Sequence, residues 1–327
     1  MSSNITNVSE VDSESYNRLP TLLLRLCVTV EGVVMLVLNW TLAYAICRVK
    51  TLHAKEFMLP LGMAIGDVFS GVSLIILSTY RNLLELTGNM GLRVTPERCY
   101  YGPPFLSILI MGLLMQGLVP IFISCDRLVA CYSVQLYMKL TTAHTLGLTL
   151  TAIGLSLLLT SLMTASSWFL DGVIPAYCIL FDALPTWLTS TYNTSQTIMS
   201  VVSFLIYVGA LCALHYGPQS KVEGSSLLEA NRNRQRKVTN TLSLIMVTEF
   251  FMVFIPNTVY AVIAWLQLSS SVTYLLVSIM ANLINLNALM NPIIFFYKNS
   301  VLREALVKAY PILRYAKAQE LTTVQNM

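Results

Sequence analysis

Seven long apolar runs place the strongest constraint on how this chain can fold. Each run is long enough to cross a bilayer core of roughly 30 Å as a helix. Backbone groups in hydrocarbon must be satisfied within the segment, so single runs of this length are helices rather than strands. The predicted spans cover residues 26–46, 57–77, 100–125, 145–170, 194–214, 238–265 and 272–297. The sequence therefore predicts an all-α integral membrane protein, a seven-transmembrane-helix bundle.

The composition agrees with a membrane location. Of 327 residues, 55% are hydrophobic and 11% are charged, whereas soluble domains carry about a quarter charged residues. The net charge of +4 gives no sign of a nucleic-acid partner. We expect three parts: an extracellular amino-terminal tail over 1–21, the bundle over 22–297, and a cytoplasmic amphipathic helix with a short tail over 298–327. Apolar residues at helical spacing in the last part predict a short helix lying on membrane lipid.

Basic residues predict the orientation of the chain. They gather between spans one and two, three and four, and five and six, and again after span seven. Short loops rich in lysine and arginine favour the cytoplasmic side. The amino terminus is then extracellular, in agreement with glycosylation sequons at Asn4 and Asn7, which are modified only when translocated. We expect a multi-pass protein of the plasma membrane with a cytoplasmic carboxyl terminus.

The third run carries no charge from Tyr100 to Cys125 and then breaks into Asp126-Arg127. An acid–base pair cannot sit in lipid without help, so this pair marks a membrane boundary. The orientation places that boundary on the cytoplasmic side.

Several ionisable groups lie inside the predicted spans, where they are functional hypotheses by default. Asp67 is near the middle of span two, and Asn287 and Asn291 are four residues apart on one face of span seven. These three could form a polar node that holds a sodium ion; the alternative is a protonated carboxyl group bonded to a neighbour. We expect no other cofactor. Glu31 and Glu249 also lie within spans, and the sequence indicates no partner for either.

Two spans contain a proline that predicts a kink. In span seven, Pro292 follows Asn291, and in span six, Pro256 lies close to Phe250 and Phe254. An aromatic stripe is more often packing than function, but proline-kinked helices are natural moving parts of a bundle. These five residues are the predicted activation hinges.

Together these residues form a pattern that resembles the rhodopsin-like (class A) G-protein-coupled receptors over nearly the whole chain. The pattern consists of Asn39, Ala64, Asp67, Asp126-Arg127-Leu128, Phe250, Pro256 and Asn291-Pro292. Within that class, the Asp-Arg-Leu ending and the compact loops are most similar to the nematode serpentine chemoreceptors.

The resemblance implies a role for each matching residue. Arg127 would receive the α-subunit of a heterotrimeric G protein once the cytoplasmic ends open, with Asp126 holding it at rest. Asn39 would accompany Asp67, Asn287 and Asn291 in the sodium-linked node. Cys99 and Cys178 would form the outer disulfide.

The chain departs from the family pattern at several positions. Leu128 replaces the usual tyrosine after the arginine, and Phe254 stands in the place of a tryptophan. Phe295 occupies the place of the seventh-span tyrosine, while Tyr297 lies two residues later, on roughly the opposite face. Cys99 is about one helical turn further from the arginine than the pattern expects, which puts the disulfide geometry in question.

The sixth span begins with Arg236 and Lys237, so it offers no acid that could restrain Arg127. We expect a resting state held mainly by Asp126, and measurable basal activity.

The resemblance also bears on the ligand. Amine receptors carry an aspartate where this chain has Leu109, and span seven has no lysine for retinal. A cavity with the family geometry would be lined by Leu109, Leu113, Asn257 and Asn285, an apolar site with a few amides. It suits an extracellular ligand that is small and neutral, such as an odorant, and a short peptide at the outer loops stays open.

Other classes of protein fit the sequence less well. A transporter or channel would also place polar groups in its spans, but transporters often show paired repeats, which this chain lacks. A membrane enzyme is disfavoured because there is no HExxH, no GxSxG and no cluster of histidines. A receptor-shaped protein that does not signal is the third alternative.

Overall fold

A computed structural model describes residues 18–89, 91–102, 105–180, 183–216, 226–266 and 270–310. Seven helices in this part of the chain are long and apolar enough to cross a membrane. They confirm the predicted seven-helix bundle. The sequons at Asn4 and Asn7 lie outside the described residues, as do residues 1–17 and 311–327 of the two predicted terminal parts.

The long helices follow one another in chain order. They are α1 (Arg18–Arg48), α2 (Met58–Leu86), α4 (Leu106–Tyr132), α6 (Thr142–Ser166), α7 (Thr186–Tyr216), α8 (Ser226–Glu249) with α9 (Ile255–Leu266), and α10 (Ser270–Lys298). The shorter elements are 3₁₀ turns at Lys50–Leu52, Lys55–Phe57 and Ser167–Phe169, and α3 (Pro96–Tyr101), α5 (Val134–Lys139), α11 (Ser300–Ala309), β1 (Arg93–Val94) and β2 (Ile174–Pro175).

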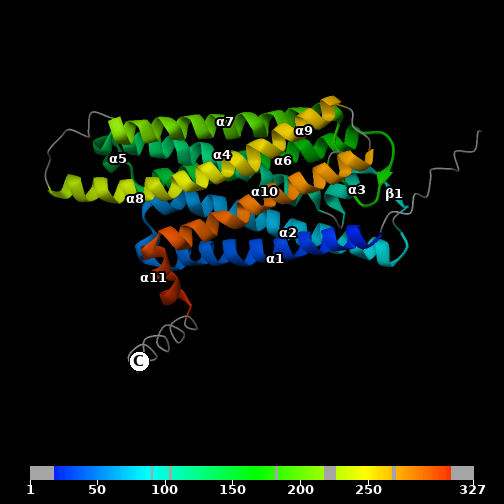
Figure 1. Ribbon diagram of the computed structural model, residues 1–327, viewed down its shortest axis with the longest axis horizontal. Coiled ribbons are helices and arrows are strands. Elements are labelled where there is room, and N and C mark those ends of the chain that lie inside the picture. The colour runs from blue at the N-terminus through cyan, green and yellow to red at the C-terminus, as the bar shows by residue number, and fades with distance from the viewer. Residues whose placement is uncertain are drawn as a thin grey trace, which may run out of the picture.

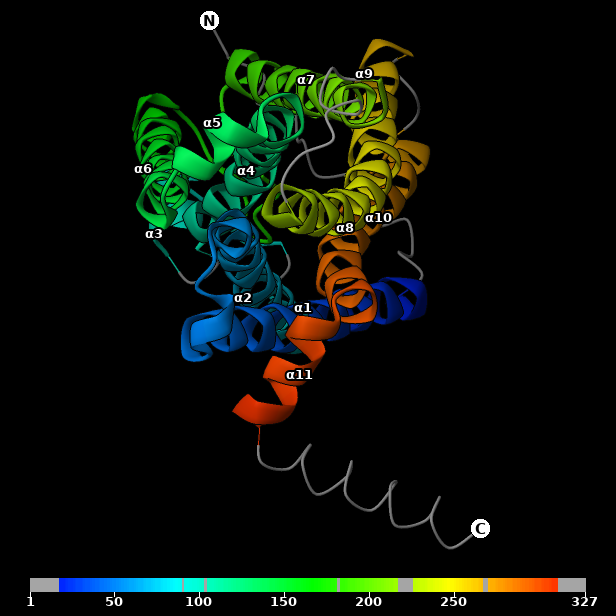
Figure 2. The same cartoon turned by 90° about the vertical axis from the view of Figure 1, so that its left-hand side faces the viewer.

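The helices run side by side along the long axis of the molecule (Figure 1). In the end-on view α4 lies between α2, α6 and α7 (Figure 2), and it contacts all three. We call the end that holds the Cys99–Cys178 disulfide the disulfide end. The opposite end, near which Asp126 and Arg127 lie, is the Arg127 end.

Small residues allow α2 and α4 to approach closely, as is common between membrane helices. A Cβ atom added to Gly112 of α4 would lie 2.2 Å from Ser70 Oγ, 2.8 Å from Ser70 N and 2.9 Å from Gly66 O. Because two of these neighbours are backbone atoms of α2, a larger residue at position 112 would force the two helices apart.

The third span differs from its predicted bounds at both ends. Tyr100 belongs to the short helix α3, and α4 begins only at Leu106. Phe105, just before α4, takes a left-handed backbone conformation with φ of 46°. At the other end, α4 continues to Tyr132, so Asp126 and Arg127 lie inside the helix rather than at its end.

The sixth span is not a single α-helix. Between α8 and α9, Phe250–Phe254 forms a π-helix, and Pro256 is the second residue of α9. Proline has no N–H to donate and its ring crowds the carbonyl four residues earlier, and a wider turn is one way to relieve that conflict. The π-helix lies in the turn that precedes Pro256, and the kink at Pro256 stays a prediction.

Two small features complete the bundle. Helix α11 begins at an Asn299 cap, whose Oδ1 accepts from the Leu302 N–H at 3.1 Å, and Leu302 is fully buried. This is the short helix that the sequence predicts after span seven. At the disulfide end, β1 and β2 form an antiparallel pair with Arg93 opposite Pro175 and Val94 opposite Ile174.

The close approach of α2 and α4 leads to a stability prediction. We expect Gly112→Ala to lower the free energy of unfolding by about 1–3 kcal/mol, because it overpacks the contact with α2. Gly154→Ala in α6 is the matched control, since an added Cβ there has nothing within 4 Å. It should leave stability unchanged or raise it by up to ~1 kcal/mol. Thermal unfolding of the purified protein in detergent measures both, and equal effects would contradict this view of the helix contact.

Candidate functional site

Arg127 is a fully buried cation near one end of the bundle. Its side chain is 1% exposed, and that of its neighbour Asp126 is 4% exposed. Arg127 Nε donates to Asp126 Oδ2 at 3.0 Å, and Nη2 donates to the same oxygen. A buried charge is tolerated only when it is paired and hydrogen-bonded, so the ion pair is what lets α4 carry both residues inside the bundle.

Two further residues hold Arg127, and both come from outside α4. Nη2 donates to the hydroxyl oxygen of Tyr137 at 2.7 Å, and Nη1 donates to Gln235 Oε1 at 2.9 Å. Gln235 in turn donates from Nε2 to Glu56 Oε1 at 3.1 Å. The expectation that Asp126 is the main restraint is therefore incomplete, because α8 supplies an amide where no acid is available.

Tyr137 is positioned by α5. Ser133 caps this helix by accepting from the Leu136 N–H at 3.3 Å, and Lys55 Nζ lies 3.8 Å from the centre of the Tyr137 ring. Burial raises the pKa of the Tyr137 phenol above its ordinary value, which keeps its proton in place. The hydroxyl can then accept from Arg127 and donate to Asp126 Oδ2 at 3.4 Å.

Sequence reasoning missed Tyr137, Gln235 and Glu56. In the sequence, Tyr137 is 10 residues and Gln235 is 108 residues from Arg127. Glu56 is 179 residues from Gln235. No local spacing connects them, so only the packing of α4, α5 and α8 brings them together.

The predicted polar node lies among α2, α4 and α10. Asp67 is fully buried, and its Oδ1 accepts from Gln116 Nε2 at 2.8 Å. Asn291 approaches Asp67 closely enough to interact electrostatically, without a hydrogen bond of standard geometry. Asn287 and Asn291 are both buried, and their side-chain oxygens have no hydrogen-bond partner. Gln116 was missed by sequence reasoning, although an amide in the middle of an apolar run was a usable signal.

Asn39 joins α1 to α10 at the proline of span seven. Its Nδ2 donates to Met35 O and to Ala288 O, each at 3.1 Å. Ala288 is four residues before Pro292, whose missing N–H would otherwise bond that carbonyl. The Asn39 amide therefore satisfies the acceptor that Pro292 leaves free.

The predicted hinge residues of span six form an aromatic stack. The rings of Phe250 and Phe254 are 4.8 Å apart, and Phe204 of α7 stacks on Phe250 at 4.3 Å. In span seven, Phe295 is buried whereas Tyr297 is 73% exposed. Tyr297 thus faces away from the interior, as its displaced position indicated.

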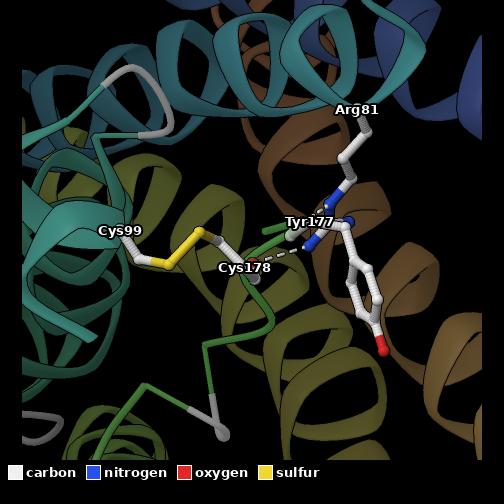
Figure 3. Close-up of a disulfide and its surroundings, with 4 residues drawn as sticks. All are labelled: Arg81, Cys99, Tyr177 and Cys178. Carbon is white, nitrogen blue, oxygen red and sulfur yellow. Dashed lines mark hydrogen bonds between the residues drawn. A yellow bond between two sulfur atoms is a disulfide. The ribbon is translucent and has the colours of Figure 1, made fainter. Parts of the chain in front are cut away.

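Cys99 and Cys178 form a disulfide at the disulfide end of the bundle, as the resemblance implies. Their Cα atoms are 5.6 Å apart, within the usual range for a disulfide. Arg81 of α2 donates from Nε to Tyr177 O at 2.8 Å and from Nη2 to Cys178 O at 2.9 Å (Figure 3).

The four predicted ligand-binding residues lie on three helices. Leu109 and Leu113 of α4 are partly buried against the apolar cluster that contains the disulfide. Asn257 donates to Val253 O of its own span at 2.9 Å, and Asn285 donates to Glu31 Oε2 of α1 at 3.4 Å. Glu31 thus has a partner that the sequence did not reveal. The ligand-binding assignment stays a prediction.

A seven-helix bundle with a buried Asp126–Arg127 pair near one end and a disulfide at the other has the architecture of a rhodopsin-like receptor. Residues 32–310 match the family model of the serpentine type 7TM GPCR chemoreceptor Srsx. The match covers most of the chain, so the protein belongs to this family of multi-pass membrane receptors, which is not a family of enzymes. It confirms the resemblance to the serpentine chemoreceptors. No relative among the curated proteins matches the chain.

The role of Asn39 can be tested by its loss. We expect Asn39→Ala to lower the free energy of unfolding by about 1–3 kcal/mol, because the buried Ala288 carbonyl would lose its donor. Asn240→Ala on the exposed side of α8 is the matched control and should change stability by less than ~0.5 kcal/mol. Thermal unfolding of both variants measures the difference, and an unchanged Asn39 variant would refute the assigned bond.

Proposed function

We propose that this receptor binds an extracellular ligand at the disulfide end and activates a heterotrimeric G protein at the Arg127 end. The observation that carries the proposal is Arg127 itself, a buried cation shared among α4, α5 and α8. In the proposed orientation, the Arg127 end faces the cytoplasm and the disulfide end faces outwards, in the plasma membrane. The basic loops and the sequons support this orientation.

Activation would be a population shift between a closed and an open Arg127 end. In the closed state, Gln235 links Arg127 of α4 to Glu56 at the start of span two. Outward movement of α8 would break both bonds and uncover Arg127 for the G protein. The π-helix at Phe250–Phe254 and the proline beyond it supply a place where span six can bend.

The ligand would be a small neutral or weakly polar molecule of the odorant kind. Leu109 and Leu113 offer an apolar wall, and Asn257 and Asn285 offer amides. A short peptide bound at the outer loops is the alternative ligand.

The polar node would hold a sodium ion in the resting state. Asp67 supplies a carboxylate, and Asn287 and Asn291 supply side-chain oxygens that have no other partner. These are hard oxygen donors of the type that alkali and alkaline-earth cations prefer.

The decisive experiment compares the wild type with Arg127→Ala in cells that co-express a panel of G-protein α-subunits. We expect the wild type to produce a second-messenger signal that Arg127→Ala abolishes at equal surface expression. If both resemble empty cells across a broad library of odorants and peptides, the signalling proposal fails.

Gln235 should set the basal activity. We expect Gln235→Ala to raise the basal signal by roughly tenfold, because losing a hydrogen bond to a charged group removes about 1.5 kcal/mol or more of closed-state stability. Gln235→Glu should raise the basal signal less than Gln235→Ala, because a carboxylate keeps an acceptor for Arg127 but loses the donor to Glu56 and repels that acid. Asn240→Ala on the same helix is the control. A basal signal that does not change among the three variants would exclude Gln235 as a restraint.

Sodium should act through Asp67. Replacing potassium chloride by sodium chloride at constant ionic strength is expected to lower agonist affinity or basal signal in the wild type. Asp67→Asn should remove that difference. If the variant keeps full sodium sensitivity, the ion does not bind at the node.

A further inference from the structure

Lys55 holds the short helix α5 from outside that helix. It belongs to the 3₁₀ turn Lys55–Phe57, which leads into α2, and it is partly buried. Its ammonium nitrogen Nζ donates to Leu140 O at 3.0 Å and also to Tyr137 O. The same nitrogen lies 3.8 Å from the centre of the Tyr137 ring. One cation therefore contacts both the backbone and the ring of the residue that bonds Arg127.

Helix α5 needs such support because it is short. Val134–Lys139 has six residues, and isolated helices of fewer than about 12 residues are marginal in water. The carbonyl groups at the carboxyl end of a helix lack partners within it, and a cation there is favourable. Ser133 caps the amino-terminal end of α5, and Lys55 supplies donors at the opposite end. The position of the Tyr137 hydroxyl therefore depends on Lys55.

The next residue, Glu56, holds the other partner that Arg127 draws from outside α4. Glu56 is buried, and its Oε1 accepts from Gln235 Nε2 at 3.1 Å. Gln235 Oε1 in turn accepts from Arg127 at 2.9 Å. Consecutive Cα atoms are about 3.8 Å apart, so Lys55 and Glu56 cannot move far independently. Helices α5 and α8, which supply the two outside partners of Arg127, are thus tied to one turn of the chain.

We propose that Lys55 is a positioning residue of the Arg127 switch, and that Lys55 and Glu56 form a bracket that couples α5 to α8. Lys55 acts on Arg127 through Tyr137. When α8 moves outward, Glu56 loses its bond to Gln235, and the turn that carries Lys55 loses one of its anchors. Helix α5 then loosens as α8 leaves, so Tyr137 and Gln235 release Arg127 together. The inference rests on the proposed function and adds to it the residues that make the opening concerted.

The first test measures the basal second-messenger signal at equal surface expression. Lys55→Met keeps the length of the side chain but removes its charge and its donors. It should raise the signal by roughly fivefold, because charge-assisted hydrogen bonds are lost. Lys55→Arg keeps a cation and should retain most of the restraint. Lys50→Met is the matched control, since Lys50 is an exposed lysine of the preceding 3₁₀ turn, and it should signal like the wild type. If the wild type signals and Lys55→Met does not change that signal, the proposal is overturned.

Tyr137→Phe separates positioning from general support of the fold. This variant keeps the ring that Lys55 contacts but removes the hydroxyl that bonds Arg127. In that background Lys55→Met should add no further signal, because the path to Arg127 is already cut. An equal increase in both backgrounds would mean that Lys55 only supports the fold, and its assignment as a positioning residue would be wrong.

The second test needs no G protein. It measures hydrogen exchange of the α5 amides in the full chain, held in nanodiscs of uncharged phosphatidylcholine. Lys55→Met should speed this exchange by roughly fivefold, whereas Lys50→Met should not change it. Glu56→Ala should also speed it, although the bond to Gln235 that it removes is made with α8. The effect of Glu56→Ala should persist in the Tyr137→Phe background, where coupling through Arg127 is cut and only the turn connects the two helices.

The exchange result also separates the bracket from the signalling proposal. The coupling is refuted if Glu56→Ala leaves α5 exchange unchanged, or if Lys50→Met speeds it as much as Lys55→Met does. If exchange changes as expected while no variant signals with any G protein, the bracket stands and the proposed function fails.

Discussion

The burial of one guanidinium group is the constraint on which the Arg127 end depends. Arg127 cannot stay in the bundle interior unless its donors are satisfied, and it draws those acceptors from α4, α5 and α8. Two of these acceptors are themselves held in place. Tyr137 is positioned by the Ser133 cap of α5 and by the contact of its ring with Lys55. Gln235 is positioned by its bond to Glu56. The network therefore fixes the positions of three helices at once, and a change in any one of them reaches the arginine.

Most of the fold follows from hydrophobicity, because each span is a long apolar run whose backbone must bond internally. The bounds of span three do not follow from it. The run from Tyr100 to Cys125 carries no charge, yet the helix starts at Leu106 and continues to Tyr132. Hydropathy does not reveal the left-handed conformation of Phe105. A hydropathy scan also ends a span at a charged pair. Asp126 and Arg127 lie inside α4 because Tyr137 and Gln235 bond to Arg127 from outside the helix.

Site residues could be predicted where one residue is unusual within its own span. They could not be predicted where their role depends on contacts between several helices. Asp67, Asn291 and Pro292 are unusual in a membrane span, so they stand out in the sequence alone. Gln235 is an ordinary residue in a polar stretch, and its importance comes only from lying beside Arg127 in space. Glu249 stands out in the sequence as an acid within a span, but its burial depends on how α8 packs.

Helix α8 runs from the Arg127 network to the irregular turn of span six. Gln235 and Glu249 are fourteen residues apart, which is nearly four full turns and about 21 Å along the axis, so both lie on almost the same face. Buried apolar residues, Leu242 and Met246 among them, fill that face in between. Because α8 ends at the π-helix where span six can bend, a swing of α8 about that turn moves Gln235, at the far end, more than it moves Glu249, and so breaks the bond to Arg127 first.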